Sequence, residues 1–581
     1  LKPMAFLNIK SNWLVFLALA LVIFTVFGNA LFNGFSYDDH YLILENPYIK
    51  DFSFIKQVLT SDVTLATPLQ KASGYYRPVS MVYLMGLYQM WGLNPAGLHL
   101  MNLLLHLLNA FFVFLIVGAM AQDRRVAFLA GLLFAIHPIH VEAVAPIFNY
   151  MGLLASCFAL ASFYMFIKSE GMRKVPATIA SLGLFSLGLF SKEEVIILPV
   201  LFVLYDFIFI HQLSFAKAWA AIKKYLWFVL PMGAYLFLRS QIIESKAAFG
   251  FWDLSLSLNV TSEQSVFSAL VSVARTFASY IGLFVFPFKL SAFYLFGPVM
   301  AMGFFAIFAS VFLVLGLLAY GIFNAKKQPL IAFLIGFFFV SSFLVSNLIP
   351  IGGLFAERFM YFPSVAYCAL FAFMFFRFFD QCRGDSGRSQ RFFLQMFLIA
   401  IIVLYGQKTA ARNYVWRNDI TLWADTALKT PNSMIVHLFL ADAYHARAKY
   451  DDAIKEYKIV LQLPKVPAAR IHNTLGKIYG GRKQYDLAIE EFVKSLKANP
   501  RDVETYYNLG ITSLFQDKVD AALKYFDAAK AVDKDYPWTY YGIGLVYEKQ
   551  KKFEEAREMF HKALNLKPNF KMAQEALKRL P

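Results

Sequence analysis

Two adjacent aspartates, Asp38 and Asp39, follow the first long apolar segment of the 581-residue chain. Ionisable residues inside a membrane are costly and usually functional, whereas carboxylates at its edge are common, so a pair of them there needs a further reason. A positioned carboxylate can act as a general base, because it takes a proton from a weak nucleophile such as an alcohol. Hydrated charge at the exit of a helix explains the doublet, taken alone, equally well. Both interpretations, a catalytic base and a solvated helix end, are open at this point.

Further polar residues stand at the ends of later apolar segments. The planar guanidinium of an arginine binds phosphate oxygens through two hydrogen bonds, so cations in such places suit a phosphate group. Each also has a structural interpretation: Lys192 can pair with the glutamates that follow it, and Arg358 can anchor the interface between membrane and water. The residues concerned are Arg77, His137, His140, Glu142, Lys192, Glu193, Glu357 and Arg358.

His137 and His140 are weak candidates for metal ligands. They lie three residues apart with Pro138 between them, and this spacing is not a strong metal signature. Hydrogen-bonded packing or a phosphate contact explains the pair better. We therefore assign no metal site, and whether a divalent metal assists stays open.

The composition indicates a polytopic membrane protein, because 59% of the residues are hydrophobic and only 16% are charged. Much of the formal net charge of +17 lies in short loops between apolar segments, where basic residues report orientation. We therefore expect no nucleic-acid partner. The three cysteines do not indicate a disulfide framework. The N-terminal apolar stretch is too long for a signal peptide, so we expect a retained anchor.

Hydropathy predicts eleven membrane spans, since about 20 apolar residues cross the hydrocarbon core of a bilayer. Two further apolar windows, 79–92 and 264–288, carry charged or proline residues and either span the membrane or lie along its interface. With a cytoplasmic N-terminus and these windows left out, every dense basic cluster falls in a cytoplasmic loop. The polar residues named above then share the outer face. The predicted spans are near 12–33, 98–120, 126–145, 150–167, 176–190, 195–211, 226–242, 299–323, 328–347, 359–380 and 391–408.

A second region begins after about Gln407, where polar helical patterning replaces the apolar runs. Gly476, Gly510 and Gly544 recur at a fixed step that is typical of tetratricopeptide repeats, helix–turn–helix units that stack into a solenoid. We predict an all-α chain in which a transmembrane helix bundle precedes an α-solenoid. The predicted domains are 1–411, with a first outer loop at 34–97, and 412–581, with a half repeat at 412–433, repeats at 434–467, 469–502, 503–536 and 537–570, and a cap at 571–581.

Several motifs occur together with the repeats. They are the acidic doublet, Tyr76-Arg77-Pro78, the run from His137 to Glu142, Ser191-Lys192-Glu193 and the run from Ala356 to Ser364. As a set, they resemble the transmembrane and tetratricopeptide-repeat O-mannosyltransferases, members of the GT-C superfamily of glycosyltransferases. The resemblance covers nearly the whole chain and implies a GT-C-type membrane domain.

The resemblance also implies a reaction. A sugar, a mannose-like hexose, leaves a polyprenyl phosphate for a Ser or Thr hydroxyl of a protein outside the cytoplasm, and the repeats dock that acceptor. Asp38 or Asp39 is the implied general base. The phosphate is held by Arg358, Lys192 and Arg77, and the site is shaped by His137, His140, Glu142, Glu193 and Glu357.

Two other functions fit the same sequence. The first is a GT-C transferase that acts on a lipid or a cell-surface glycan, and the second is a membrane scaffold without catalysis that gathers partners through its repeats. The small number of repeats and the short outer loops favour a bacterial relative in the inner membrane, with the site and the repeats in the periplasm. The alternative location is the endoplasmic reticulum membrane, with a lumenal site.

Overall fold

The computed structural model describes residues 11–64, 74–169, 174–243, 266–295, 303–346, 355–382, 384–464 and 466–581. These residues form helices, turns and irregular segments, and no strand occurs among them. The chain divides into two compact units, Leu1–Lys429 (unit 1) and Thr430–Pro581 (unit 2).

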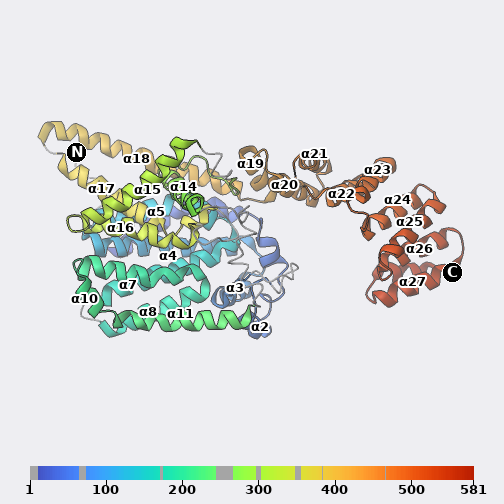
Figure 1. Cartoon of the computed structure of the whole chain (residues 1–581), viewed down its shortest axis with the longest axis horizontal. Helices are drawn as coiled ribbons and strands as arrows, with labels where there is room; N and C mark the ends of the chain where they lie inside the picture. The colour runs from blue at the N-terminus through green and yellow to red at the C-terminus, as the bar shows by residue number, and fades with distance from the viewer. Residues whose placement is uncertain are drawn as a thin grey trace. The chain divides into compact units, whose positions relative to one another are not determined.

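Unit 1 consists of long apolar helices joined by short helical segments (Figure 1). Helix α4 lies among neighbours, because it contacts α1, α5 and α7, while α17 packs on α5 and α8 packs on α7. The long and short α-helices of unit 1 are α1 (Asn12–Phe27), α2 (Ile55–Thr60), α3 (Pro78–Trp91), α4 (Pro95–Ala121), α5 (Arg124–Ile136), α6 (Val141–Val144), α7 (Tyr150–Ser169), α8 (Lys174–Ser191), α9 (Leu198–Tyr205), α10 (Phe215–Ala220), α11 (Lys223–Ile242), α14 (Val266–Val285), α15 (Phe304–Asn324), α16 (Pro329–Ser341), α17 (Ser364–Gln381), α18 (Gly384–Val415) and α19 (Asp419–Lys429).

Tight or wide helical turns connect these helices where the backbone changes direction. A proline at the first position of one of them, Pro138, lies between α5 and α6, where the helices are bent by 49°. The segments are η2 (Gly28–Phe32), η3 (His40–Leu44), η4 (Phe52–Phe54), η5 (Pro138–His140), η6 (Ile147–Asn149), η7 (Glu193–Ile197), η8 (Asp206–Ile210), η11 (Phe343–Val345) and η12 (Glu357–Met360).

Five helices of the described part are long and apolar enough to cross a membrane, or six if the bent pair of α5 and α6 counts as one span. Unit 1 therefore has the character of a multi-pass membrane protein, but the predicted number of eleven spans is not confirmed and stays a prediction. The two windows left open by the sequence contain α3 and α14. The five candidate spans are Asn12–Phe32, Pro95–Ala121, Ile147–Ser169, Phe304–Asn324 and Gly387–Val415, and shorter apolar helices occur at Val175–Ser191, Leu270–Val285 and Pro329–Ser341.

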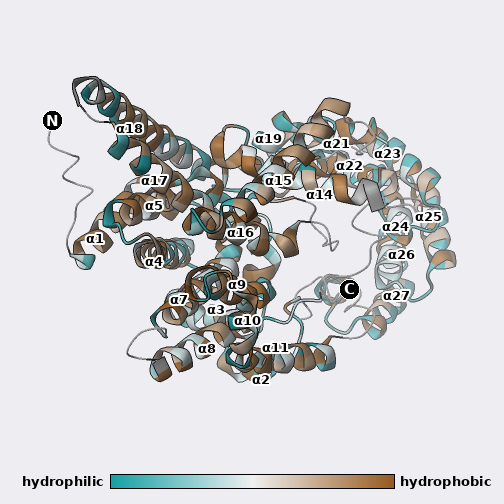
Figure 2. Ribbon diagram, turned by 60° about the vertical axis from the view of Figure 1, so that its left-hand side comes forward, coloured by the Kyte–Doolittle hydropathy of each residue, from teal (hydrophilic) through white to brown (hydrophobic). Residues whose placement is uncertain are grey.

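The candidate spans differ in how deeply they are buried. Within α7, 78% of the most apolar window is buried inside the protein, whereas only 11% of that window in α15 is buried. Exposed phenylalanines line α15, among them Phe304, Phe305 and Phe312. Figure 2 shows the apolar colouring of the unit 1 helices and the mixed colouring of unit 2. Apolar side chains exposed along a long helix are suited to contact with lipid.

Unit 2 is a series of helical hairpins that follow one another along the chain (Figure 1). Consecutive helices contact each other throughout the unit, as expected for stacked repeats. The helices are α20 (Met434–Ala446), α21 (Tyr450–Leu461), α22 (Ala468–Gly481), α23 (Tyr485–Ala498), α24 (Val503–Phe515), α25 (Val519–Val532), α26 (Pro537–Lys549), α27 (Phe553–Leu566) and α28 (Lys571–Arg579).

The repeated glycines have a common packing role. Each lies under a phenylalanine ring of the next helix, and a methyl group in its place would come within 2.5 Å of that ring. A real side chain at that distance would force the ring away. The pairs are Gly476 with Phe492, Gly510 with Phe526 and Gly544 with Phe560.

The two compact units divide between Lys429 and Thr430, and the domain boundary predicted at 411/412 stays a prediction. That boundary falls inside α18, and the segment predicted as a half repeat, 412–433, contains α19, which belongs to unit 1. Within unit 1, Trp423 of α19 is buried, and its ring packs against that of Tyr37 in the loop after the first helix.

Candidate active site

The aspartate doublet lies in a turn after η2, and its two carboxylates have different environments. Asp39 is fully buried, and its oxygens accept hydrogen bonds from the backbone N–H groups of Ser36 at 3.0 Å and Phe148 at 2.7 Å. Burial raises the pKa of Asp39 to about 7, while these two hydrogen bonds act in the opposite direction. Asp39 therefore ties its turn to the segment before α7 and has no oxygen without a protein partner.

Asp38 is only half-buried, and its carboxylate accepts a hydrogen bond from the hydroxyl group of Tyr41. Burial raises the pKa of Asp38, whereas the Tyr41 hydroxyl and the charge of Arg358 lower it. Glu142 is also near enough to raise it. The two aspartates thus differ: Asp38 lies near the charges of Arg358 and Glu142, whereas both carboxylate oxygens of Asp39 accept backbone hydrogen bonds.

Arg358 and Glu142 form a buried ion pair between η12 and α6. Glu142 is fully buried and accepts hydrogen bonds from Nη1 of Arg358 and from its backbone N–H at 3.2 Å. The guanidinium also lies over the ring of Phe359, 5.3 Å from its centre. About a quarter of the Arg358 side chain, 26%, remains exposed. The arrangement fixes a partly accessible cation beside Asp38.

Arg77 is also paired with a carboxylate. Its Nε and Nη2 donate to the two oxygens of Glu193 at 2.9 and 2.5 Å, and its guanidinium lies 4.2 Å from the centre of the Tyr75 ring. Burial raises the pKa of Glu193, but the positive charge of Arg77 outweighs it and the pKa falls to about 2. This bidentate pair joins the start of α3 to η7, so a phosphate would have to compete with Glu193 for Arg77.

Lys192 pairs with Glu194 at 2.7 Å, and its side chain is 13% exposed. Glu194 lies on the wall of a cavity of about 30 Å³ between α7, η7, α16 and η12. This wall is mostly apolar and reaches Phe359, the residue after Arg358. The cavity is lined by Gly152, Ala155, Ser156, Ala159, Glu194, Val195, Ile197, Leu198, Ser341, Val345, Phe359, Phe362 and Pro363.

The two histidines of the candidate site are engaged in packing. His137 bonds to the Phe284 carbonyl at 3.0 Å through Nε2, and its Nδ1 accepts from the Ile139 N–H at 3.2 Å. His140 bonds to the Phe134 carbonyl at 2.8 Å and to the Ser364 hydroxyl at 2.7 Å. All four ring nitrogens thus have protein partners. Among the residues that the structure describes, no group of three His, Cys, Asp or Glu side chains could hold a metal ion.

Glu357 is fully buried, and its Oε1 accepts from the Ser291 N–H and the Tyr294 hydroxyl, both at 2.6 Å. Arg412 of α18 approaches the same oxygen at 3.7 Å. Burial raises the pKa of Glu357. Glu357 therefore holds the loop after α14 in place. The spacing gave no signal for it, because the partner lies 66 residues away.

Sequence reasoning missed two residues that contact the turn. Tyr41, one helical turn after Asp38, bonds to the Asp38 carboxylate, and this spacing of three residues is a signal that could have been used. Asp419 of α19 accepts from the backbone N–H of Tyr37 and bonds to Nε2 of His40, both at 2.7 Å. No local pattern points to Asp419.

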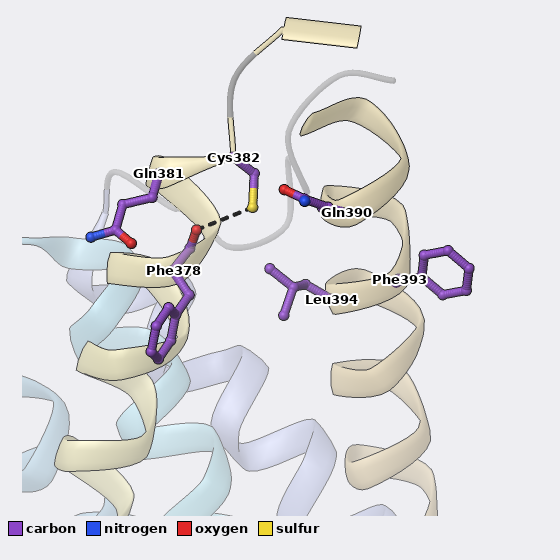
Figure 3. Close-up of a pocket in the computed structure, with 6 residues that line it drawn as sticks. All are labelled: Phe378, Gln381, Cys382, Gln390, Phe393 and Leu394. Carbon is purple, nitrogen blue, oxygen red and sulfur yellow. Dashed lines mark hydrogen bonds between the residues drawn. The ribbon is translucent and has the colours of Figure 1, made fainter. Parts of the chain in front are cut away.

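A larger open pocket of about 490 Å³ lies elsewhere in unit 1, between the end of α17 and the first part of α18 (Figure 3). The Cys382 thiol donates to the Phe378 carbonyl at 3.3 Å at its edge. It contains none of the residues predicted to form the site. Its lining residues are Phe378, Gln381, Cys382, Gln390, Phe393 and Leu394.

Comparison with known proteins begins with the repeats. Residues 473–537 and 537–570 each match a family model described as Tetratricopeptide repeat. Among solved structures, the chain is similar to YrrB, described as a TPR protein with an unusual peptide-binding site, with 20% identity and a TM-score of 0.25. That match covers 30% of this chain and 89% of YrrB.

Curated proteins match far more of the chain. Protein O-mannosyl-transferase TMTC3 of Mus musculus is 24% identical over 98% of this chain and 61% of its own length. The Homo sapiens protein of the same name is 24% identical over 98% of this chain and 62% of its own. Tmtc3 of Drosophila melanogaster is 23% identical over 85% of this chain and 59% of its own. The chain thus spans about three fifths of the length of these relatives.

These matches confirm the resemblance drawn from the motifs of the chain. Over almost its whole length, the chain is similar to proteins named protein O-mannosyl-transferases, and its C-terminal unit carries tetratricopeptide repeats.

Proposed function

We propose that the chain is a glycosyltransferase that moves a mannose-like hexose from a polyprenyl phosphate to Ser or Thr hydroxyls of a protein. The observation that supports this most is the asymmetry of the doublet. Asp38 is half-buried beside the partly exposed cation of Arg358, whereas Asp39 is fully used by backbone N–H groups. A base and a phosphate-binding cation at one place are what this transfer needs.

In the proposed reaction, Asp38 takes the proton from the acceptor hydroxyl as its oxygen bonds to the anomeric carbon. The bond between that carbon and the phosphate oxygen breaks, and the phosphate leaves with the electron pair. Arg358 stabilises the charge that develops on the phosphate, since a cation is most effective where water is largely excluded. Tyr41 orients Asp38 through its hydroxyl group.

The donor is proposed to lie between Arg358 and Lys192. Both residues border the apolar wall that contains Phe359 and Glu194, and an isoprenoid chain requires such a wall next to its phosphate. Of the three predicted phosphate ligands, Arg77 is the weakest candidate, because two of its nitrogens donate hydrogen bonds to Glu193. Glu142, Glu193 and Glu357 hold the cations and loops in place, and His137 and His140 pack the helix ends around them.

The proposal includes the location. On the eleven-span topology, the site and the repeats share the extracytoplasmic side, in a bacterial inner membrane with a periplasmic site, and unit 2 docks the acceptor protein. Reporter fusions after residues 38 and 581 test this sidedness. Reporters on opposite sides of the membrane would contradict it.

The test of the chemistry compares two neighbouring variants in membranes. Asp38→Asn removes the base. The rate of sugar transfer to the acceptor protein, measured as glycopeptides by mass spectrometry, should therefore fall by about 10²- to 10⁴-fold with the fold unchanged. Asp39→Asn should instead lower the stability of the protein, because an amide cannot accept both backbone N–H groups. Glu45→Gln, an exposed carboxylate in the same loop, is the control. Full transfer by Asp38→Asn would refute the assignment.

The same measurement separates the competing functions. A transferase with a lipid or glycan acceptor should consume the donor. Cells that lack the chain should then contain the same glycopeptides as cells that have it. A scaffold without catalysis should consume no polyprenyl-linked sugar and should be indifferent to Arg358→Met.

A further inference from the structure

The turn that carries Asp38 is held from a distant part of the chain. Oδ1 of Asp419 accepts from the backbone N–H of Tyr37, and Oδ2 bonds to Nε2 of His40, both at 2.7 Å. Tyr37 and His40 flank the doublet on its two sides. One carboxylate, the first residue of α19, therefore grips both ends of the segment that contains Asp38.

The turn needs such a restraint because its backbone is strained. Tyr37 has a φ of +53°, in the left-handed region that side-chain-bearing residues rarely adopt. Such strain persists only where the surroundings impose it, and it is frequent at active sites. The Tyr37 ring also meets the Trp423 ring edge to face at 5.3 Å, and Trp423 lies four residues after Asp419 on the same face of α19.

Helix α19 is itself fixed within unit 1. Just before it, the Arg417 carbonyl accepts from the Gly34 N–H at 2.9 Å, beside the turn. At its far end, Asp425 pairs with Arg412 of α18 at 2.7 Å, and Lys429 donates to the Leu290 carbonyl at 2.6 Å. Asp419 thus belongs to a helix that is fixed at several points, so the position of α19 determines the position of the turn.

We propose that Asp419 is a positioning residue for the acidic turn: it sets the backbone of residues 37–40 so that the Asp38 carboxylate faces Arg358. Its role in transfer rests on the function proposed above, whereas its grip on the turn does not. The segment predicted as a half repeat would then belong to the active-site architecture.

The test uses the full chain in detergent micelles with three variants. Asp419→Ala removes both contacts, and Asp419→Asn retains an acceptor for the Tyr37 N–H but lacks the second carboxylate oxygen that bonds to His40. Leu428→Ala, with a side chain that is 86% exposed on the same helix, is the matched control. Hydrogen exchange of the Tyr37 amide reports the grip, and kcat and KM for sugar transfer report positioning.

We expect Asp419→Ala to speed exchange of the Tyr37 amide and to lower kcat by about 10- to 100-fold, with KM for the donor within about twofold, as for a misplaced base. Asp419→Asn should lie between Asp419→Ala and the unaltered chain, and Leu428→Ala should match the unaltered chain. Unchanged exchange in Asp419→Ala would overturn the grip on the turn. Faster exchange with unchanged kcat would overturn the positioning role.

A chain that transfers no sugar at all would overturn the proposed function and the role of Asp419 in it. The exchange measurement would still show whether Asp419 restrains the turn. The two failures are therefore distinguishable.

Discussion

The candidate site of unit 1 and the repeats of unit 2 are stabilised in opposite ways. In unit 2, the same contact between a glycine and a phenylalanine ring recurs in successive repeats, and each repeat depends mainly on its neighbours. In unit 1, several residues of the site depend on one particular partner far along the chain, such as Glu193 for Arg77 or Asp419 for Tyr37. The repeats should therefore respond to substitution locally, and the site should respond as a whole.

The largest expected effect is on the rate of sugar transfer, which should depend on pH through the site of unit 1. Asp38 works as a base only when ionised, so transfer should fall about tenfold per pH unit as the pH drops below the Asp38 pKa. Burial raises that pKa and the Arg358 charge lowers it, so the acid limb should move to higher pH in Arg358→Met. The residual rate of this variant across the pH range is the measurement. An acid limb at the same pH in both proteins would contradict the placement of Arg358 beside Asp38.

The next effect concerns the stability of unit 1. Arg77→Met leaves Glu193, whose side chain is only 18% exposed, without its partner. This should cost about 3 to 5 kcal/mol, measured by unfolding in detergent. Because the pKa of Glu193 is lowered from 4.5 to about 2, the stabilising contribution of the pair is present above pH 4.5 and is lost as the pH falls through about 2. Replacing both partners, as in Arg77→Met with Glu193→Leu, should recover most of the loss. A double variant as unstable as the single one would break the argument.

A smaller effect is expected in unit 2. Gly510→Ala places a methyl group 2.5 Å from the Phe526 ring and should destabilise the repeats by about 1 to 3 kcal/mol. Hydrogen exchange should rise in α24 and α25 and remain unchanged in the acidic turn. Gly481→Ala is the matched control, since nothing lies within 4 Å of the added methyl group. Equal destabilisation by both variants would show that the glycine and ring contact does not matter.

The smallest effect is expected for an exposed ion pair of unit 2. Lys477 and Glu504 meet at 2.9 Å, but their side chains are 45% and 47% exposed. Water and salt screen such a pair, so Lys477→Met should change the free energy of unfolding by less than about 1 kcal/mol. A larger loss of unfolding free energy would contradict the expected difference between the repeats and the site of unit 1.

The sequence predicts unit 2 well because its information is local and repeated. The glycine spacing predicted helical hairpins, and the helix pair α26 and α27 lies within the repeat expected at 537–570. In unit 1, hydropathy identified apolar segments, but it does not register where a helix breaks, as at Pro138. The number of spans therefore depends on helix lengths and bends that composition alone does not contain.

The candidate site was predictable as a set of residue types and less so as a set of partners. The doublet stood out by its position, but the choice between Asp38 and Asp39 depends on the N–H of Phe148, 109 residues away. Glu357 was recognised, whereas its partners Ser291 and Tyr294 were not. Contacts between irregular segments have no period, so only the folded chain brings them together.

The distance in sequence between Tyr37 and Asp419, 382 residues, also bears on biosynthesis. Ribosomes add roughly 5 to 20 residues per second, so the acidic turn waits roughly 20 to 80 s for the carboxylate that grips it. If Asp419 has the role proposed above, a nascent chain has a poorly positioned Asp38 until α19 has been made. Chains that terminate before α19 would then have the lowered transfer rate expected of Asp419→Ala.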